Sequence, residues 1–112
     1  MIMKIKITNK DIINGSFVIP DGVTKIRDHA FDYCTSLKKI IIPESVTKIG
    51  DYAFYRCTSL KKIIIPDSVT EIGDMAFYGC RSLIKVSLPK KVKLGINVFF
   101  RCHPHLKIEY RD

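Results

Sequence analysis

The chain has 112 residues, of which 46% are hydrophobic and 27% are charged, and its formal net charge is +8 at pH 7. These proportions exclude wholesale disorder and indicate one globular domain. No run of about 18 apolar residues occurs, which excludes a membrane-spanning helix. The first ten residues, MIMKIKITNK, lack the apolar segment of a signal peptide, so we expect a cytoplasmic location.

Residues 1–19 differ from the rest of the chain, which is repetitive. Met1–Ile7 alternates apolar and charged side chains, a pattern that predicts a β-strand. Asn14 and Gly15 form a turn dipeptide, and Ser16–Ile19 leads from this turn into the repeats. We expect residues 1–19 to cap the N-terminal end of a stack of repeats.

From Pro20 onward the sequence repeats with a period of 23 residues. Residues 43–65 share 17 of 23 positions with residues 20–42 and 14 of 23 with residues 66–88, and a degenerate copy fills residues 89–112. A fixed period of this length is typical of a solenoid, in which each repeat buries its apolar face only by stacking on its neighbours. We therefore predict a single solenoid domain over residues 1–112.

Part of the middle repeat, PESVTKIGDYAFYRCTSLKKIII, is patterned like a short helix. Ala53, Cys57 and Leu60 are apolar at helical spacing, and Asp51 stands where a helix N-cap would be. We therefore predict a short helical turn over Tyr52–Cys57, with equivalent turns in the other repeats.

The end of each repeat is patterned like a strand. Residues 60–65 precede Pro66, which lacks the amide that a continuing parallel strand would need. Val69–Ile72 suits a second short extended segment. Alternation along the main strands is expected to send one set of side chains into the core, namely Ile40, Ile42, Ile63, Ile65, Val86 and Leu88.

The repeated pattern IPxSVTxIGDxAFxxCxSLxxIxIP resembles the BspA-type leucine-rich repeats of bacterial, protist and viral proteins. The resemblance extends from Phe17 to about Ile108. It implies an α/β solenoid of right-handed turns, with a short parallel β-sheet on the concave face and short helical turns opposite. It also implies no enzymatic activity and a role in adhesion or protein–protein binding.

The last copy departs from the pattern. Val92 and Leu94 are one residue closer together than their counterparts, and one residue is added between Cys102 and Leu106. We interpret residues 89–112 as a degenerate repeat that forms a C-terminal cap, with charged side chains shielding the last edge strand.

Four cysteines follow the repeat period rather than the CxxC spacing of a metal site, namely Cys34, Cys57, Cys80 and Cys102. We expect them to point inward as small apolar residues. Stacked strands lie about 4.7–4.9 Å apart, whereas the Cβ atoms of a disulfide lie about 3.8 Å apart. The thiols are therefore expected to stay reduced, and a column of ligands does not converge on zinc.

No arrangement of a nucleophile with a base is apparent, so we predict neither an enzyme nor catalytic residues nor a cofactor. His29 is expected on the surface. His103 and His105 form one pair in a proline-containing loop, which is weak evidence for a metal site, and no metal is predicted.

The outward side of the predicted sheet carries the candidate partner-binding site. Lys39, Lys62 and Lys85 are expected to form one column beside an apolar column of Ile41 and Ile64. Like charges about 5 Å apart repel one another, and an acidic partner would relieve that repulsion. The full candidate set is Lys38, Lys39, Ile41, Lys61, Lys62, Ile64, Lys85 and Ser87.

These observations favour a non-enzymatic binding module, an adaptor or an inhibitor, that holds an acidic protein partner. The alternatives are sequence-independent nucleic-acid binding through the same lysines, although the face offers no stacking aromatics, and a surface adhesion fragment. The lysines also suit a purely structural role, as guards of an exposed sheet. A second candidate surface consists of Tyr52, Tyr55, Tyr78 and Phe100. These rings could equally pack against one another along the flank of the solenoid.

Overall fold

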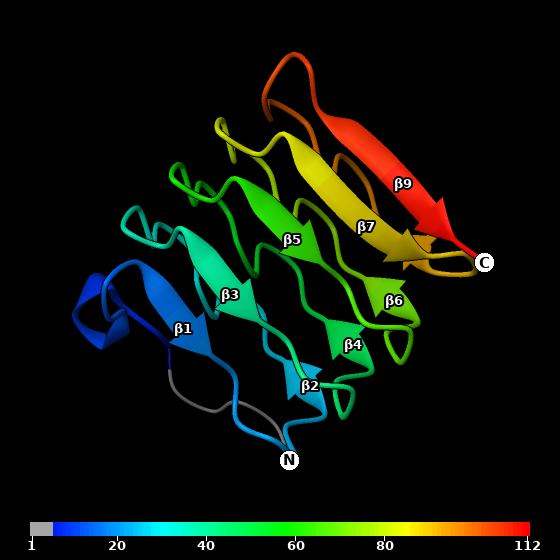
Figure 1. Ribbon diagram of the computed structural model, residues 1–112, viewed down its shortest axis with the longest axis horizontal. Coiled ribbons are helices and arrows are strands. Elements are labelled where there is room, and N and C mark those ends of the chain that lie inside the picture. The colour runs from blue at the N-terminus through cyan, green and yellow to red at the C-terminus, as the bar shows by residue number, and fades with distance from the viewer. Residues whose placement is uncertain (1–5) are drawn as a thin grey trace.

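The computed structural model describes residues 6–112, which form a parallel β-solenoid of about four turns (Figure 1). The strand expected over Met1–Ile7 lies mostly in residues 1–5, outside the described residues, and Lys6 and Ile7 belong to no strand. In chain order the elements are the 3-10 turn η1 (Asn9–Asp11), β1 (Ser16–Val18), β2 (Lys25–Ile26), β3 (Lys39–Ile41), β4 (Lys48–Ile49), β5 (Lys62–Ile64), β6 (Glu71–Ile72), β7 (Lys85–Pro89), β8 (Lys93–Leu94) and β9 (Lys107–Arg111).

Each repeat contributes one longer and one shorter strand, as the pattern predicts. The shorter strands β2, β4, β6 and β8 pair in that order into one parallel sheet, which we call the short-strand sheet. The longer strands β1, β3, β5, β7 and β9 lie along another side, which we call the long-strand face (Figure 1). This face is divided, because β1 pairs with β3 and β5 pairs with β7 and β9, while β3 and β5 are not paired.

The third side of the solenoid consists of turns, and the helical turn expected over Tyr52–Cys57 is absent. Tyr52 and Arg56 adopt left-handed backbone conformations, with φ of 57° and 55°. The amides of Tyr52, Phe54 and Arg56 donate to carbonyls of the next repeat over 2.7–2.9 Å. A helix over these residues would direct the amide of Arg56 to the carbonyl oxygen of Tyr52, whereas the stack uses that amide between repeats, so consecutive turns replace the helix. We call this third side the turn side.

Asp51 does not cap a helix, as was expected, but connects two repeats. Its Oδ1 accepts a hydrogen bond of 2.8 Å from the amide of Asp74, and Asp28 receives the amide of Asp51 in the same way. A Cβ atom on Gly73 would lie 2.3 Å from Asp51 Oδ1 and 2.6 Å from its backbone nitrogen. Glycine is therefore needed wherever one repeat lies against the aspartate of the one before.

The core is a continuous column of phenylalanines. Phe31, Phe54 and Phe77 are fully buried, and their rings stack with centroids 4.9 Å apart and interplanar angles of 8° and 2°. Phe17 and Phe99 extend the column at its two ends, at 5.2 and 5.6 Å. The inward positions expected for the strands are confirmed, since all six are buried: Ile40, Ile42, Ile63, Ile65, Val86 and Leu88.

The cysteines stack beside this column as free thiols. Cys34 and Cys57 are buried, as is Cys80, whereas Cys102 is only partly covered. Each thiol lies 3.1–3.3 Å from a backbone carbonyl oxygen about one repeat earlier, to which it donates, as Cys57 does to Phe31. Burial raises the pKa of Cys34 to about 11 and also raises that of Cys57. The four cysteines therefore join repeats, and the thiols of Cys34 and Cys57 remain protonated at neutral pH.

The last repeat ends in β9, which runs beside β7 over its full length. Its charged residues pair back onto the long-strand face, since Glu109 lies 3.7 Å from Lys85. Its residues at inward positions, Ile108 and Tyr110, are 37% and 56% exposed, since among the described strands β9 pairs with β7 alone. The charged side chains of β9 thus contact the long-strand face, and the capping role of residues 89–112 stays a prediction.

Candidate partner-binding site

The long-strand face carries the predicted lysines and isoleucines at its surface. Lys39, Lys62 and Lys85 are all exposed, and Ile41 and Ile64 are 45% and 70% exposed. These outward positions follow from strand alternation, because the residues between them are buried in the core. Lys38 and Lys61, just before strands β3 and β5, are exposed as well.

The lysine column is aligned only in part. The register places Lys62 opposite Lys85 and Lys85 opposite Lys107, a position that the sequence analysis omitted. Lys39 stands opposite Ser16 of β1, and no backbone pairing connects it to Lys62. The period of 23 residues leads from Lys85 to Ile108, so the repeat pattern by itself did not place Lys107 in the column.

The division between β3 and β5 leaves part of the backbone unpaired. Lys39 donates to Gly15 and Ile41 accepts from Ile19, so both residues bond toward β1. Successive residues of a parallel strand bond to opposite neighbours, which turns the amide and carbonyl of Ile40 toward β5.

The facing edge of β5 is unused in the same way. Lys61 accepts from Lys85 and Ile65 donates to Ser87, so these residues bond toward β7. The alternation then turns the backbone groups of Lys62 and Ile64 toward β3. Within residues 6–112, no hydrogen bond connects these two edges.

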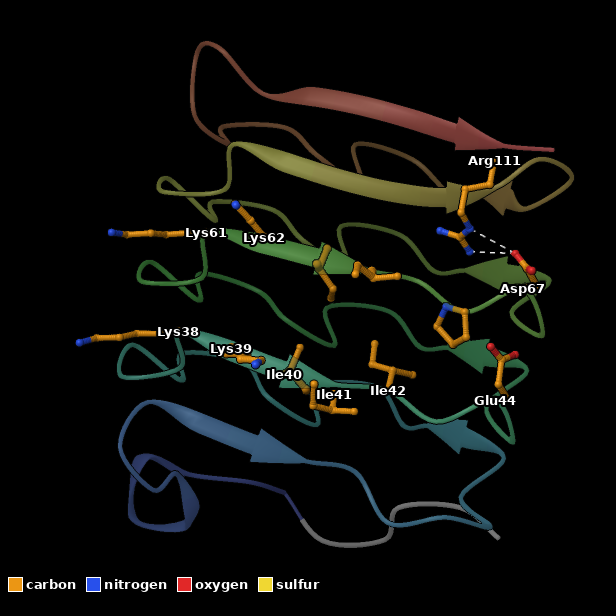
Figure 2. Close-up of a pocket in the computed structure, with 13 residues that line it drawn as sticks. Lys38, Lys39, Ile40, Ile41, Ile42, Glu44, Lys61, Lys62, Asp67 and Arg111 are labelled. Carbon is orange, nitrogen blue, oxygen red and sulfur yellow. Dashed lines mark hydrogen bonds and ion pairs between the residues drawn. The ribbon is translucent and has the colours of Figure 1, made fainter.

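A cleft of about 670 Å³ lies over this division. Figure 2 shows lysines where β3 and β5 begin and acidic side chains beyond the other end of the strands. Ile41 and Ile64 line the cleft between these two ends. The residues of the basic end are Lys38, Lys39, Lys61 and Lys62, and those of the acidic end are Glu44 and Asp67.

Arg111 limits the cleft at its acidic end, which the sequence analysis did not foresee. Its guanidinium donates to the backbone oxygen of Ile65 and lies 2.9 Å from Asp67 Oδ1. It also donates to the hydroxyl of Ser87. The side chain thus reaches from β9 across β7 to the end of β5 (Figure 2). Only the stack brings residues 44 positions apart together.

Two of the predicted site residues are already engaged within the protein. Ser87 is half-buried beneath Arg111, and Lys85 pairs with Glu109. Lys38, Lys39, Lys61 and Lys62 have no ion pair within the described part of the chain. Within the described column Lys85 is therefore the paired lysine, and four lysines without ion pairs lie together at the starts of β3 and β5.

The second predicted surface is a ladder of rings on the turn side. Tyr55 stacks on Tyr78 at 5.2 Å, and Tyr78 lies 5.8 Å from Phe100. Tyr52 packs edge-on against Tyr55 at 5.3 Å and stacks on His29 at 4.9 Å. The three tyrosines are half-buried and Phe100 is 53% exposed. Most of the surface of these rings therefore packs against rings of the neighbouring repeats.

Other candidate chemistry is sparse. Within residues 6–112 there is no group of three or more metal-ligating side chains, and no helix there is long and apolar enough to cross a membrane. His103 and His105 lie 5.7 Å apart between ring centroids. His103 Nδ1 accepts a hydrogen bond of 3.0 Å from the amide of His105, so this nitrogen already has a partner within the loop.

Stacked 23-residue turns with parallel strands define the chain as a repeat protein of the leucine-rich solenoid class. The profile of the BspA type leucine-rich repeat region matches residues 8–111. The chain therefore belongs to that family. Among curated proteins, no significant match was found.

Solved structures of bacterial proteins share this fold. A leucine-rich cell surface protein from Faecalibacterium prausnitzii is 32% identical over 88% of this chain, with a TM-score of 0.73. A leucine-rich repeat protein from Bacteroides capillosus is 26% identical over 88% of this chain and 78% of its own, with a TM-score of 0.77. The pneumococcal vaccine antigen PcpA is 27% identical over 88% of this chain, with a TM-score of 0.66. This chain spans 32% of the F. prausnitzii chain and 31% of the PcpA chain.

Proposed function

We propose that the protein is a non-enzymatic binding module that holds an acidic protein partner on its long-strand face. The observation that carries the proposal is the group of four exposed lysines without ion pairs, Lys38, Lys39, Lys61 and Lys62, beside the exposed Ile41 and Ile64. Four adjacent positive charges repel one another. Carboxylates of a partner would relieve that repulsion, and the isoleucines would add apolar contact.

The family supports the coarser part of this proposal. Leucine-rich repeats are a common scaffold for protein interaction, which suits a role as adaptor or inhibitor. One structural neighbour is described as a cell surface protein. A surface adhesion fragment is therefore the alternative setting for the same face, and the cytoplasmic location stays a prediction from the N-terminal sequence.

The test starts with affinity capture and mass spectrometry to identify an acidic partner, whose affinity is then measured by calorimetry. The triple variant Lys39→Glu, Lys62→Glu and Lys85→Glu should abolish binding and leave the melting temperature close to that of the native protein, because the three side chains are exposed. The control variant replaces Lys10, Lys90 and Lys91, which are exposed outside the candidate site, with glutamate, so that its net charge changes by the same amount. Unchanged affinity of the first triple variant would overturn the proposal.

Nucleic acid is the competing ligand for the same lysines. The stacked rings lie on the turn side and not among these lysines, so bases would find no aromatic platform beside the phosphate contacts. We expect only weak binding to random duplex DNA, and a steep loss of affinity with rising salt because phosphate contacts release counterions. Tight binding that persists above physiological salt would favour nucleic acid instead.

A further inference from the structure

We infer that the cleft between β3 and β5 binds an extended peptide segment of the acidic partner, which lies along the two strands and pairs with their unused edges. This inference rests on the proposed function, because it names the part of the partner that the long-strand face holds. The cleft selects this occupant through its backbone edges, its apolar middle and the opposite charges at its ends.

The first feature is the pair of unused strand edges. The backbone groups of Ile40 face those of Lys62 and Ile64 without a hydrogen bond between them in the described part of the chain. Such groups need a partner, which is water when the cleft is empty. An extended peptide offers alternating amides and carbonyls along the same direction, as in the addition of a strand to a sheet edge.

The second feature is that the opening is confined to one side of the stack. On the short-strand sheet, Thr47 still donates to Thr24 over 2.8 Å, and on the turn side Phe31 donates to Ala53 over 2.7 Å. Two sides of the solenoid therefore hold these repeats together while the third is open. Two strand spacings amount to about 9.6 Å, so we propose that the peptide parts β3 from β5 by bending the stack at the short-strand sheet.

The third feature is the order of charge and apolar surface along the cleft. Lysines stand at the start of the strands, Ile41 and Ile64 lie in the middle, and Glu44 lies beyond the strand ends beside Asp67, whose charge is already paired with Arg111 (Figure 2). From residue 38 to residue 44 an extended chain spans about 20 Å. The matching segment has about seven residues, with acidic residues at one end, aliphatic residues at alternate positions and a basic residue at the other end.

The binding test uses two labelled peptides, Asp-Glu-Val-Thr-Val-Thr-Lys and the same sequence reversed, in fluorescence anisotropy titrations. One of the two directions should bind, and a version with both acidic residues replaced by serine should bind about tenfold more weakly, since each exposed ion pair contributes up to about fivefold. The variants Ile64→Glu and Glu44→Lys, both at exposed positions, should weaken binding without affecting the fold. Failure of both peptide directions to bind would overturn the inference.

Amide hydrogen exchange tests the position of the peptide and separates this inference from the proposed function. In the free protein the amides of Ile40, Lys62 and Ile64 should exchange faster than that of Ile63, which bonds toward β7. The bound peptide should slow the three cleft amides, and Lys85→Glu should leave its affinity unchanged. If an acidic partner instead binds in a way that requires Lys85 and leaves the cleft amides unprotected, the proposed function holds and the cleft is not its site. If the lysine variants affect no partner, the proposed function fails by itself.

Discussion

The short-strand sheet and the long-strand face are built from the same repeats, yet one is continuous and the other is divided. Strands β2, β4, β6 and β8 pair without interruption, whereas the pairing of the longer strands stops between β3 and β5. The two neighbouring repeats, residues 20–42 and 43–65, are also the most similar pair in the chain. Near identity of two repeats therefore does not ensure that they pair along every side.

We propose that the charges at the strand starts contribute to this difference. Between β3 and β5, Lys38 and Lys39 would lie next to Lys61 and Lys62. Between β5 and β7 the equivalent of Lys61 is an isoleucine, Ile84, and Lys85 is paired with Glu109. On the short-strand sheet Lys25 stands opposite Lys48, but the next contact along the sheet joins opposite charges.

There, Lys48 stands opposite Glu71, and their side chains lie 3.3 Å apart. Like charges directly opposite each other destabilise a strand pair, and opposite charges stabilise it. The break in pairing thus coincides with the place where two pairs of lysines would meet, whereas the single pairs Lys25–Lys48 and Lys62–Lys85 stand opposite each other in paired strands.

The largest expected effect comes from breaking the core that both regions share. Phe54→Ala should lower the free energy of unfolding by about 3–5 kcal/mol, through lost apolar burial and a cavity between two stacked rings. Against a total of about 5–15 kcal/mol, this loss should be evident in a denaturant melt.

The matched control for this substitution is Tyr55→Ala, on the half-buried ring next in the chain. It should cost no more than about 1.5 kcal/mol, because that ring contributes stacking at the surface. Equal small losses in the two variants would mean that the stacked column is not the core.

The next effect concerns the continuous region alone. Gly73→Ala should destabilise the protein by about 1–3 kcal/mol, because its Cβ would lie 2.3 Å from Asp51 Oδ1 and 2.6 Å from the backbone nitrogen of that residue. The double variant Asp51→Ala with Gly73→Ala should not recover the loss, since the backbone contact stays. A full recovery in thermal melts would show that only the carboxylate excludes a side chain there.

A third prediction uses pH to weaken the cysteine column. The pKa of Cys34 is raised to about 11 by burial, above about 8.5 for an unfolded thiol. The folded protein therefore holds this proton more tightly, and its stability should fall as pH rises between those two values. We expect a loss of about 1–2 kcal/mol at pH 10 in urea melts, relative to Cys34→Ala measured at the same pH. If the stability of the native protein and that of Cys34→Ala fall equally with rising pH, this explanation is wrong.

The smallest expected effect tests why the long-strand face is divided while the short-strand sheet is continuous. Lys61→Ile places an isoleucine just before β5, as Ile84 stands just before β7, and removes one of the facing charges. The amides of Ile40 and Lys62 should then exchange more slowly, since β3 and β5 can pair, while global stability changes by less than about 1 kcal/mol. Lys90→Ile, in an exposed turn, serves as the control. Exchange rates that do not change would show that charge repulsion is not what separates the strands.

The sequence by itself determined the architecture. The 23-residue period placed Phe31, Phe54 and Phe77 in one column, and alternation along each strand distinguished buried from exposed residues. Both signals are local and repeat in register, because each repeat must present the same apolar face to its neighbours. The outward position of Ile64 and of the lysines follows from the same alternation.

Only the tertiary structure decided how the repeats are joined. The pattern around Ala53 and Cys57 suits a helix, yet the demand for hydrogen bonds between repeats overrides that local preference, and Asp51 binds the next repeat instead of capping a helix. The cleft depends on which lysines meet across two strands, and the position of Arg111 beside Asp67 depends on two intervening turns of the stack. These contacts connect residues tens of positions apart, and their energies come from neighbours that no single repeat contains.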